Sequence, residues 1–276
     1  MLANTTLFTI ATEGYLPFVL NLHASLERLG LDKSLVVYCL DDRSHTVLSE
    51  ARVPSIRYRL AETHKGNSYG TADFSRTMAY KYAVGLDLLK TGKNALYADG
   101  DIVFLRDPFG YLQEVLGDAD ADLVMQVEAP SGVFNAGFWL ARAVPSVMGL
   151  FAHLQDRLAQ ADDYVSDQKT MNAWVRERGE PRIRGLDAEL FACGNQFLEG
   201  VTIDRGGYHI DRSSRPFPRD EAYLLHFNFL INERQKIAAM ARHQAIFHPM
   251  LAAQVGLLTQ AKLAVRRLLK RTPHRS

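Results

Sequence analysis

The chain has 276 residues, of which 47% are apolar and 23% charged, and its 32 lysines and arginines nearly balance its 31 aspartates and glutamates. This composition excludes a disordered, collagen-like or low-complexity chain. The two cysteines, Cys39 and Cys193, lack CxxC spacing, which excludes a disulfide scaffold and a cysteine-only zinc site and suits a reducing compartment. No apolar run reaches the roughly 18–20 residues that cross a bilayer, and the first ten residues carry no basic leader, so we expect a cytoplasmic protein.

Short apolar runs alternate with helical patterns along the first 110 residues. The spacing predicts helices over 18–29, 74–90 (with Ser75 as its N-cap) and 168–178, and strands over 7–12, 35–40, 56–60, 95–98, 102–105, 123–127, 138–141 and 223–227. This alternation predicts an α/β fold with a mainly parallel sheet, whose ligands gather at the carboxyl ends of the strands. We expect one domain over residues 1–245, with loop-like segments at 206–207 and 212–220 that suit a flap.

The charge is unevenly distributed along the chain. Residues 234–276 contain nine lysines or arginines and no acidic residue, which leaves a net charge of −8 on residues 1–233. Apolar residues recur every three or four positions between 257 and 269, and this pattern predicts a basic amphipathic helical tail over 246–276. Either the tail packs on the body, or it lies on an anionic membrane surface at the inner face of the membrane, where each basic side chain contributes about 1 kcal/mol. We expect no nucleic-acid partner, because no aromatic residues are interleaved with the basic ones.

An acidic pair follows the apolar run 95–98. In extended chain, residues i and i+2 face the same way, so Asp99 and Asp101 can face one point, while Gly100 lets a ligand approach the backbone. Two adjacent carboxylates repel each other unless a cation lies between them. Mg²⁺ and Mn²⁺ accept such carboxylates together with nucleotide phosphates, so the segment predicts a divalent metal site.

The same segment leaves a second class of enzyme open. Residues 99–103 match the DxDx[TV] signature of the haloacid-dehalogenase phosphatases, in which Asp99 is the nucleophile. That fold places this strand near the start of the chain, whereas about 95 residues precede it here. The candidates for the later acidic pair, Asp118, Asp120 and Asp122, also follow too closely. A phosphatase and a non-catalytic nucleotide-sugar-binding module therefore stay as alternatives.

Four segments in order resemble the GT-A-fold nucleotide-diphospho-sugar glycosyltransferases, most closely the retaining group of families 8 and 77. They are residues 88–109 (LLKTGKNALYADGDIVFLRDPF), 133–138 (VFNAGF), 166–168 (SDQ) and 226–236, which opens with HFN. The resemblance implies a single GT-A-type domain and a metal-dependent enzyme. Such an enzyme moves a hexose or pentose from a nucleotide diphosphate sugar, expected to be a UDP-sugar, to a hydroxyl acceptor with retention of configuration. A glycan or lipid-linked acceptor would suit the basic tail.

The resemblance also implies the roles of individual residues. Asp99, Asp101 and His226 would bind the Mn²⁺ or Mg²⁺ ion. Asp167 and Gln168 would lie under the reacting sugar as the catalytic pair, either by covalent attack or by stabilising an oxocarbenium-like centre. The residues expected to bind the donor are Thr12, Tyr15, Lys81, Asp99, Gly100, Asn135, Gly137, Asn228 and Lys236. Lys81 stands near the position of the family 8 arginine, and the chain lacks the late Lys-Pro-Trp segment of family 8, so it is more similar to family 77.

Overall fold

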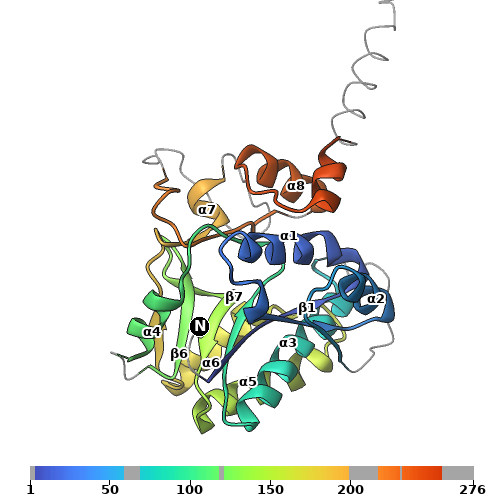
Figure 1. Ribbon diagram of the computed structural model, residues 1–276. Helices are drawn as coiled ribbons and strands as arrows, with labels where there is room; N and C mark the ends of the chain where they lie inside the picture. The colour runs from blue at the N-terminus through green and yellow to red at the C-terminus, as the bar shows by residue number, and fades with distance from the viewer. Residues whose placement is uncertain (1–3, 59–68, 118–120, 199–216, 231, 257–276) are drawn as a thin grey trace, which may run out of the picture.

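The computed structural model describes residues 4–58, 69–117, 121–198, 217–230 and 232–256 (Figure 1). The strands are β1 (Thr5–Ala11), β2 (Leu35–Cys39), β3 (Ser55–Arg57), β4 (Asn94–Ala98), β5 (Ile102–Phe104), β6 (Leu123–Glu128), β7 (Val133–Ala141), β8 (Ile183–Gly185), β9 (Phe191–Cys193) and β10 (Leu224–His226). The α-helices are α1 (Leu16–Glu27), α2 (Asp42–Glu50), α3 (Ala72–Lys90), α4 (Phe109–Gly117), α5 (Pro145–Ala159), α6 (Asp167–Arg178), α7 (Gly194–Phe197) and α8 (Glu233–Arg242).

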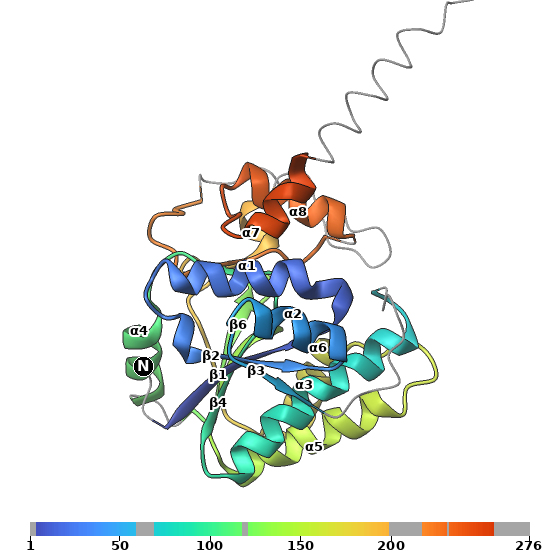
Figure 2. The ribbon, with the colours of Figure 1, turned by 45° about the vertical axis from the view of Figure 1, so that its right-hand side comes forward.

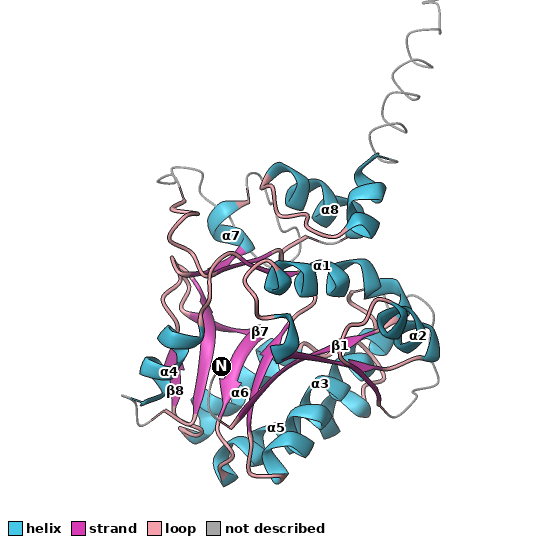
Figure 3. Ribbon diagram, viewed as in Figure 1, coloured by secondary structure: helices cyan, strands magenta, loops and turns pink. Residues whose placement is uncertain are grey.

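Within these residues, seven strands form one sheet in the order β3-β2-β1-β4-β7-β6-β8. The pairs on the β3 to β4 side are parallel, whereas β7 runs antiparallel to both β4 and β6. A second sheet of three strands, in the order β5-β10-β9, lies beside the first (Figure 3). The predicted α/β fold with a mainly parallel sheet is therefore confirmed.

Helices cover both faces of the large sheet. Because side chains alternate along a strand, Leu7 of β1 belongs to the apolar core that includes residues of α1, α2 and α4, while its neighbour Phe8 belongs to the core that includes residues of α3, α5 and α6. Figure 2 shows α1 on one side of the strands and α3 and α5 on the other. Apolar side chains on both faces of each central strand explain why those strands appear in the sequence as continuous apolar runs.

The predicted start of α3, like that of α1, is two residues too late, and its predicted N-cap is wrong. Helix α3 begins at Ala72, and its N-cap is Thr71, whose side chain accepts a hydrogen bond from the Phe74 amide at 3.2 Å. The Ser75 hydroxyl is instead engaged with Val165, from whose amide it accepts a hydrogen bond at 2.8 Å. Ser75 therefore lies inside the helix, one turn after the cap, and its hydroxyl makes a tertiary contact instead.

Residues just past the predicted domain boundary at 245 pack on the body. The Phe247 amide donates to Asn21 Oδ1 at 2.6 Å, and Leu251 is buried with α8 against Phe18 of α1. Residues 257–276 of the predicted tail, and residues 206–207 and 212–216 of the predicted loop-like segments, lie outside the described residues. In the described part of the chain, no helix combines the length and apolarity that crossing a membrane requires.

Candidate active site

Strand pairing brings the acidic pair and a distant histidine together. The turn that holds Asp99 and Asp101 leaves the carboxyl end of β4 and continues into β5, which pairs antiparallel with β10 so that Ile102 lies opposite His226. The Phe227 amide then donates to the Asp101 carbonyl at 3.1 Å. This register places the imidazole beside both carboxylates.

The three side chains form a compact group of candidate metal ligands. His226 Nε2 lies 3.5 Å from Asp99 Oδ2 and 3.4 Å from Asp101 Oδ1. One ligand atom from each residue falls within 4.8 Å of the others. Two carboxylates and one imidazole are a donor set that accepts Mn²⁺, and the carboxylates alone also suit Mg²⁺.

Gly137 makes room for this group. Its carbonyl accepts a hydrogen bond from the Asp99 amide at 2.7 Å, so β7 lies directly against the acidic turn. A Cβ atom at Gly137 would lie 2.2 Å from His226 Cε1 and 2.5 Å from Asp99 Oδ2. Only glycine leaves space for both side chains, and the residues present therefore fit a bound divalent ion.

Gln126 of β6 determines which nitrogen of His226 faces the carboxylates. Its Nε2 donates to the Phe191 carbonyl at 3.0 Å, so its Oε1 must be the atom 2.9 Å from His226 Nδ1. An amide oxygen only accepts, so Nδ1 carries the proton and the lone pair of the neutral ring lies on Nε2, toward the carboxylates. Metal-binding histidines are commonly oriented by such a partner. Sequence analysis missed Gln126, although a glutamine inside the apolar run 123–127 is a detectable signal.

Charge interactions surround the buried Asp101. Lys236, in the first turns of α8, forms an ion pair with Asp101 and donates to Tyr15 Oη at 2.7 Å. Burial alone would raise the pKa of Asp101, but Lys236 and then His226 lower it well below its ordinary value. Burial would lower the pKa of His226, yet while no cation is bound Asp101 and Asp99 together raise it well above its ordinary value; a divalent ion would replace the proton on Nε2.

The acidic turn has close neighbours on its other sides. Tyr97 donates to Asp99 Oδ1 at 2.7 Å. A Cβ atom at Gly100 would lie 3.0 Å from Tyr15 Cδ1, so the Tyr15 ring packs directly against this glycine. Thr12 is the N-cap of the short turn Glu13–Tyr15 that follows β1.

Asp167 and Gln168 open α6, with Ser166 as the N-cap, and their side chains take different partners. Gln168 Oε1 accepts from Asn135 Nδ2 at 3.0 Å, so two predicted residues meet directly. Asp167 Oδ2 accepts from Lys81 Nζ at 2.6 Å and from Tyr82 Oη at 3.0 Å, while its Oδ1 accepts from the Gln168 amide at 2.8 Å. Hydrogen bonds therefore engage both carboxylate oxygens of Asp167.

Lys81, which is predicted to bind the donor, is buried and makes its polar contacts within the protein. Its side chain is only 2% exposed, and Nζ donates to Asp167 and, at 3.1 Å, to the Ala136 carbonyl. The ammonium also lies 5.1 Å and 5.0 Å from the ring centroids of Tyr82 and Tyr97. These contacts hold Lys81 beneath the site, where it stabilises Asp167 and presents no open surface to a donor.

Asn228 lies two residues after the candidate metal ligand His226. Its Oδ1 accepts a hydrogen bond from the Gly194 amide at 2.6 Å, which attaches the segment after β10 to the start of α7. The structure thus gives Asn228 a positioning contact at the edge of the site.

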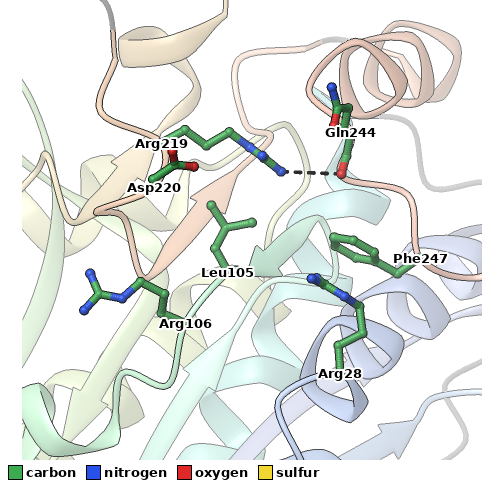
Figure 4. A pocket seen from close by; sticks show the side chains of 7 residues that line it. All are labelled: Arg28, Leu105, Arg106, Arg219, Asp220, Gln244 and Phe247. Atoms are coloured by element: carbon green, nitrogen blue, oxygen red, sulfur yellow. Dashed lines mark hydrogen bonds between the residues drawn. The ribbon is translucent and has the colours of Figure 1, made fainter.

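A separate hollow of about 360 Å³ lies away from these residues (Figure 4). Its lining residues come from the C-terminal end of α1, the far end of β5 and the loops beside α8: Arg28, Leu105, Arg106, Arg219, Asp220, Gln244 and Phe247. Tyr15 and Asp101 stand at the opposite ends of α1 and β5, so this hollow is not part of the candidate site.

The chain is similar in sequence to a protein family and to a curated protein. The model of the nucleotide-diphospho-sugar transferase family matches residues 30–240. The UDP-galactose:fucoside alpha-3-galactosyltransferase of Dictyostelium discoideum is 27% identical over 283 residues, an alignment that covers 84% of this chain and 41% of that protein. The chain thus spans about two fifths of the length of this curated relative.

Two solved structures share the fold. One is a glycosyltransferase involved in the glycosylation of the major capsid of PBCV-1, with a TM-score of 0.53, 12% identity and coverage of 84% of this chain and 96% of that chain. The other is the WbbM bifunctional glycosyltransferase, with a TM-score of 0.51, 13% identity and coverage of 81% of this chain and 45% of that chain.

Proposed function

Because this chain belongs to the nucleotide-diphospho-sugar transferase family, we propose that it is a metal-dependent glycosyltransferase that retains the configuration of the transferred sugar. The observation that carries the metal dependence is the cluster of Asp99, Asp101 and His226, whose ligand atoms lie within 4.8 Å of one another. The cleared space at Gly137 and the orientation of the imidazole by Gln126 support the same proposal.

Asp99, Asp101 and His226 would hold the ion, for which Mn²⁺ is our first choice. A divalent ion bound there stabilises negative charge on a departing nucleotide diphosphate. Lys236 supplies a second positive charge next to Asp101, and Tyr15 lies within hydrogen-bond distance of that ammonium. We therefore assign Lys236 to the diphosphate and Tyr15 to the nucleoside.

On the sugar side, we assign Gln168 to substrate binding and Asp167 to electrostatic stabilisation, and Asn135 to positioning Gln168 through their hydrogen bond. A covalent attack by Asp167 is disfavoured, because Lys81, Tyr82 and the Gln168 amide engage both of its oxygens. Lys81 instead keeps Asp167 ionised, and a fixed negative charge stabilises a developing oxocarbenium-like centre.

The donor and acceptor classes come from similarity. The Dictyostelium relative is named as a UDP-galactose:fucoside galactosyltransferase. By analogy, we propose a UDP-sugar as donor and a glycan hydroxyl as acceptor. The match to the family model over residues 30–240, together with the imidazole beside the acidic pair, disfavours the phosphatase alternative.

We further propose that the protein acts at the cytoplasmic face of a membrane. The sequence supports this, because residues 257–276 carry six lysines or arginines and no acidic residue. In the full chain, changing Arg266 and Arg267 to glutamate should reduce co-sedimentation with vesicles rich in anionic lipid. Unchanged co-sedimentation would argue against a membrane role for this segment.

A donor panel tests the enzymatic proposal. The protein should release nucleotide from one or more UDP-sugars in the presence of Mn²⁺ and not in EDTA, and NMR of the product should show the anomeric configuration of the donor. Release of phosphate from p-nitrophenyl phosphate with Mg²⁺, without turnover of any UDP- or GDP-sugar, would replace the proposal by the phosphatase alternative. Nucleotide binding without turnover would favour a binding module.

A further inference from the structure

Glu128 is a buried carboxylate to which neither the sequence analysis nor the metal site assigns a role. It is the last residue of β6 and is 3% exposed. Among the described residues, no basic side chain forms an ion pair with it. A buried carboxylate without a cation is unfavourable unless strong hydrogen bonds stabilise it, so its presence here needs an explanation.

All the hydrogen bonds of the Glu128 carboxylate end on one oxygen. Oε1 accepts from Asn135 Nδ2 at 2.8 Å and from Gln168 Nε2 at 2.9 Å. Asn135 Nδ2 also donates to Gln168 Oε1, which closes a ring of three side chains. Glu128 Oε2 takes no hydrogen bond from the described residues. This oxygen is not fully buried, so part of its surface is accessible.

The ring leaves two groups for a ligand. Asn135 uses both hydrogens of Nδ2 within the ring, and its Oδ1 accepts from the Gly137 amide at 2.8 Å. Gln168 Oε1 is engaged with Asn135 and the Ala136 amide. What remains is one N–H of Gln168 Nε2 and the oxygen Glu128 Oε2, a donor and an acceptor on neighbouring side chains. A hydroxyl group both donates and accepts, and so it matches this pair.

The ring also borders the metal ligands. Asn135 is hydrogen-bonded to the backbone of Gly137, whose α-carbon faces His226 and Asp99. A hydroxyl bound by Glu128 and Gln168 would therefore belong to the part of the substrate next to the metal-bound diphosphate, which in a nucleotide sugar is the donor sugar.

We propose that Glu128 is a specificity-determining residue of the donor-sugar site. Its Oε2 accepts a hydrogen bond from one hydroxyl of the donor sugar, and Gln168 Nε2 donates to the same hydroxyl. The inference rests on the proposed function and adds a selection rule to it, because a polar pair built for a hydroxyl rejects a donor that lacks that hydroxyl.

The Glu128→Gln variant tests the role with little change of structure. The glutamine oxygen still accepts from Asn135 and Gln168, whereas its NH₂ group replaces Oε2 and turns the acceptor into a donor. With Mn²⁺ present, calorimetry should show affinity for the preferred UDP-sugar reduced roughly 10- to 100-fold, as expected for a lost hydrogen bond to a charged group. Affinity for UDP, which carries no sugar, should stay within about twofold by the same reasoning.

A matched control is Glu114→Gln, the same change at an exposed position of α4, which should leave both affinities and the melting temperature unchanged. Deoxy analogues of the donor sugar test the contact in the unmodified protein. The analogue without the contacted hydroxyl should bind about 10- to 100-fold more weakly than its parent. The Glu128→Gln variant should bind the deoxy analogue and its parent UDP-sugar with equal affinity.

Three outcomes would overturn the inference. In the first, Glu128→Gln binds the UDP-sugar as tightly as the unmodified protein does. If the variant then shows a higher KM for the acceptor alone, Glu128 contacts a hydroxyl of the acceptor and not of the donor. Equal binding of all deoxy donors would reject the contact even if the variant failed to fold. If the unmodified protein bound neither UDP nor any UDP-sugar with Mn²⁺, the proposed function would fail first, and the inference with it.

Discussion

At the scale of single residues, the ion pair between Lys81 and Asp167 makes a clear prediction about stability. Both side chains are largely buried, so Lys81→Met would leave an uncompensated carboxylate. We expect the free energy of unfolding to fall by about 3–5 kcal/mol in urea denaturation. Lys90→Met, at the exposed end of the same helix, should cost under about 1 kcal/mol. A small stability loss at Lys81 combined with weaker donor binding would favour a direct contact of Lys81 with the donor.

The same pair predicts how stability depends on pH. Burial alone would raise the pKa of Asp167, but Lys81 and Tyr82 lower it below its ordinary value. A group with a depressed folded-state pKa stabilises the protein above its unfolded pKa, about 3.9 for aspartate, and loses that contribution as pH falls through the folded value. The stability advantage over Asp167→Asn should therefore be largest at pH 7 and shrink below about pH 4. An advantage that grew on acidification would contradict the assignment.

Gln126 offers a third test at this scale. Gln126→Leu removes the acceptor that holds the proton on His226 Nδ1, so the ring loses its preferred tautomer and orientation. We expect Mn²⁺ affinity to fall roughly 10- to 100-fold in calorimetry. Gln126→Glu keeps an acceptor at this position and should retain more of the affinity than the leucine variant. Equal affinity in the two variants would show that His226 needs no such partner.

At the scale of elements, the approach of β7 to the acidic turn is the most sensitive contact. Gly137→Ala would place a methyl group 2.2 Å from His226 Cε1, so the imidazole or the strand must move. We expect loss of Mn²⁺-dependent UDP binding. Gly149→Ala, inside α5 with no atom within 4 Å of the new Cβ, should keep that binding and gain about 0.5–1 kcal/mol in helix stability. Retained binding in Gly137→Ala would mean that His226 and Asp99 do not share one ion.

The central strands could be predicted because their signals are local. The apolar runs at β1, β2 and β4 and the helical period of α3 follow from residues close in sequence. The pairing of β10 with β5 is a tertiary event without a local signal, and His226 was associated with the acidic pair through resemblance alone. The burial of Lys81 was not predicted, although it lies among the buried residues of α3 next to Tyr82. Glu128 and Gln126 were missed because their strand was read only for its apolar residues.

At the scale of the whole molecule, the distribution of charge and the chemistry of the site both indicate that donor binding depends on local cations. Residues 1–233 carry a net charge of −8, and a nucleotide diphosphate is also anionic. General attraction to the body therefore does not explain donor binding, which must depend on local cations. The structure supplies Lys236 beside Asp101 and a ligand set for a divalent ion. The proposed binding of the nucleotide diphosphate therefore depends on that ion.

Calorimetric titration of UDP, with Mn²⁺ and with EDTA, is the most direct test of that dependence. The unmodified protein and Asp107→Asn, a matched change at an exposed aspartate, should bind UDP with Mn²⁺ and lose binding in EDTA. Asp101→Asn, with its fold checked by melting temperature, should show no Mn²⁺-dependent binding. Equal affinity of Asp101→Asn and the unmodified protein, or UDP binding unaffected by EDTA, would contradict the claim that Asp99, Asp101 and His226 bind one cation for the nucleotide diphosphate.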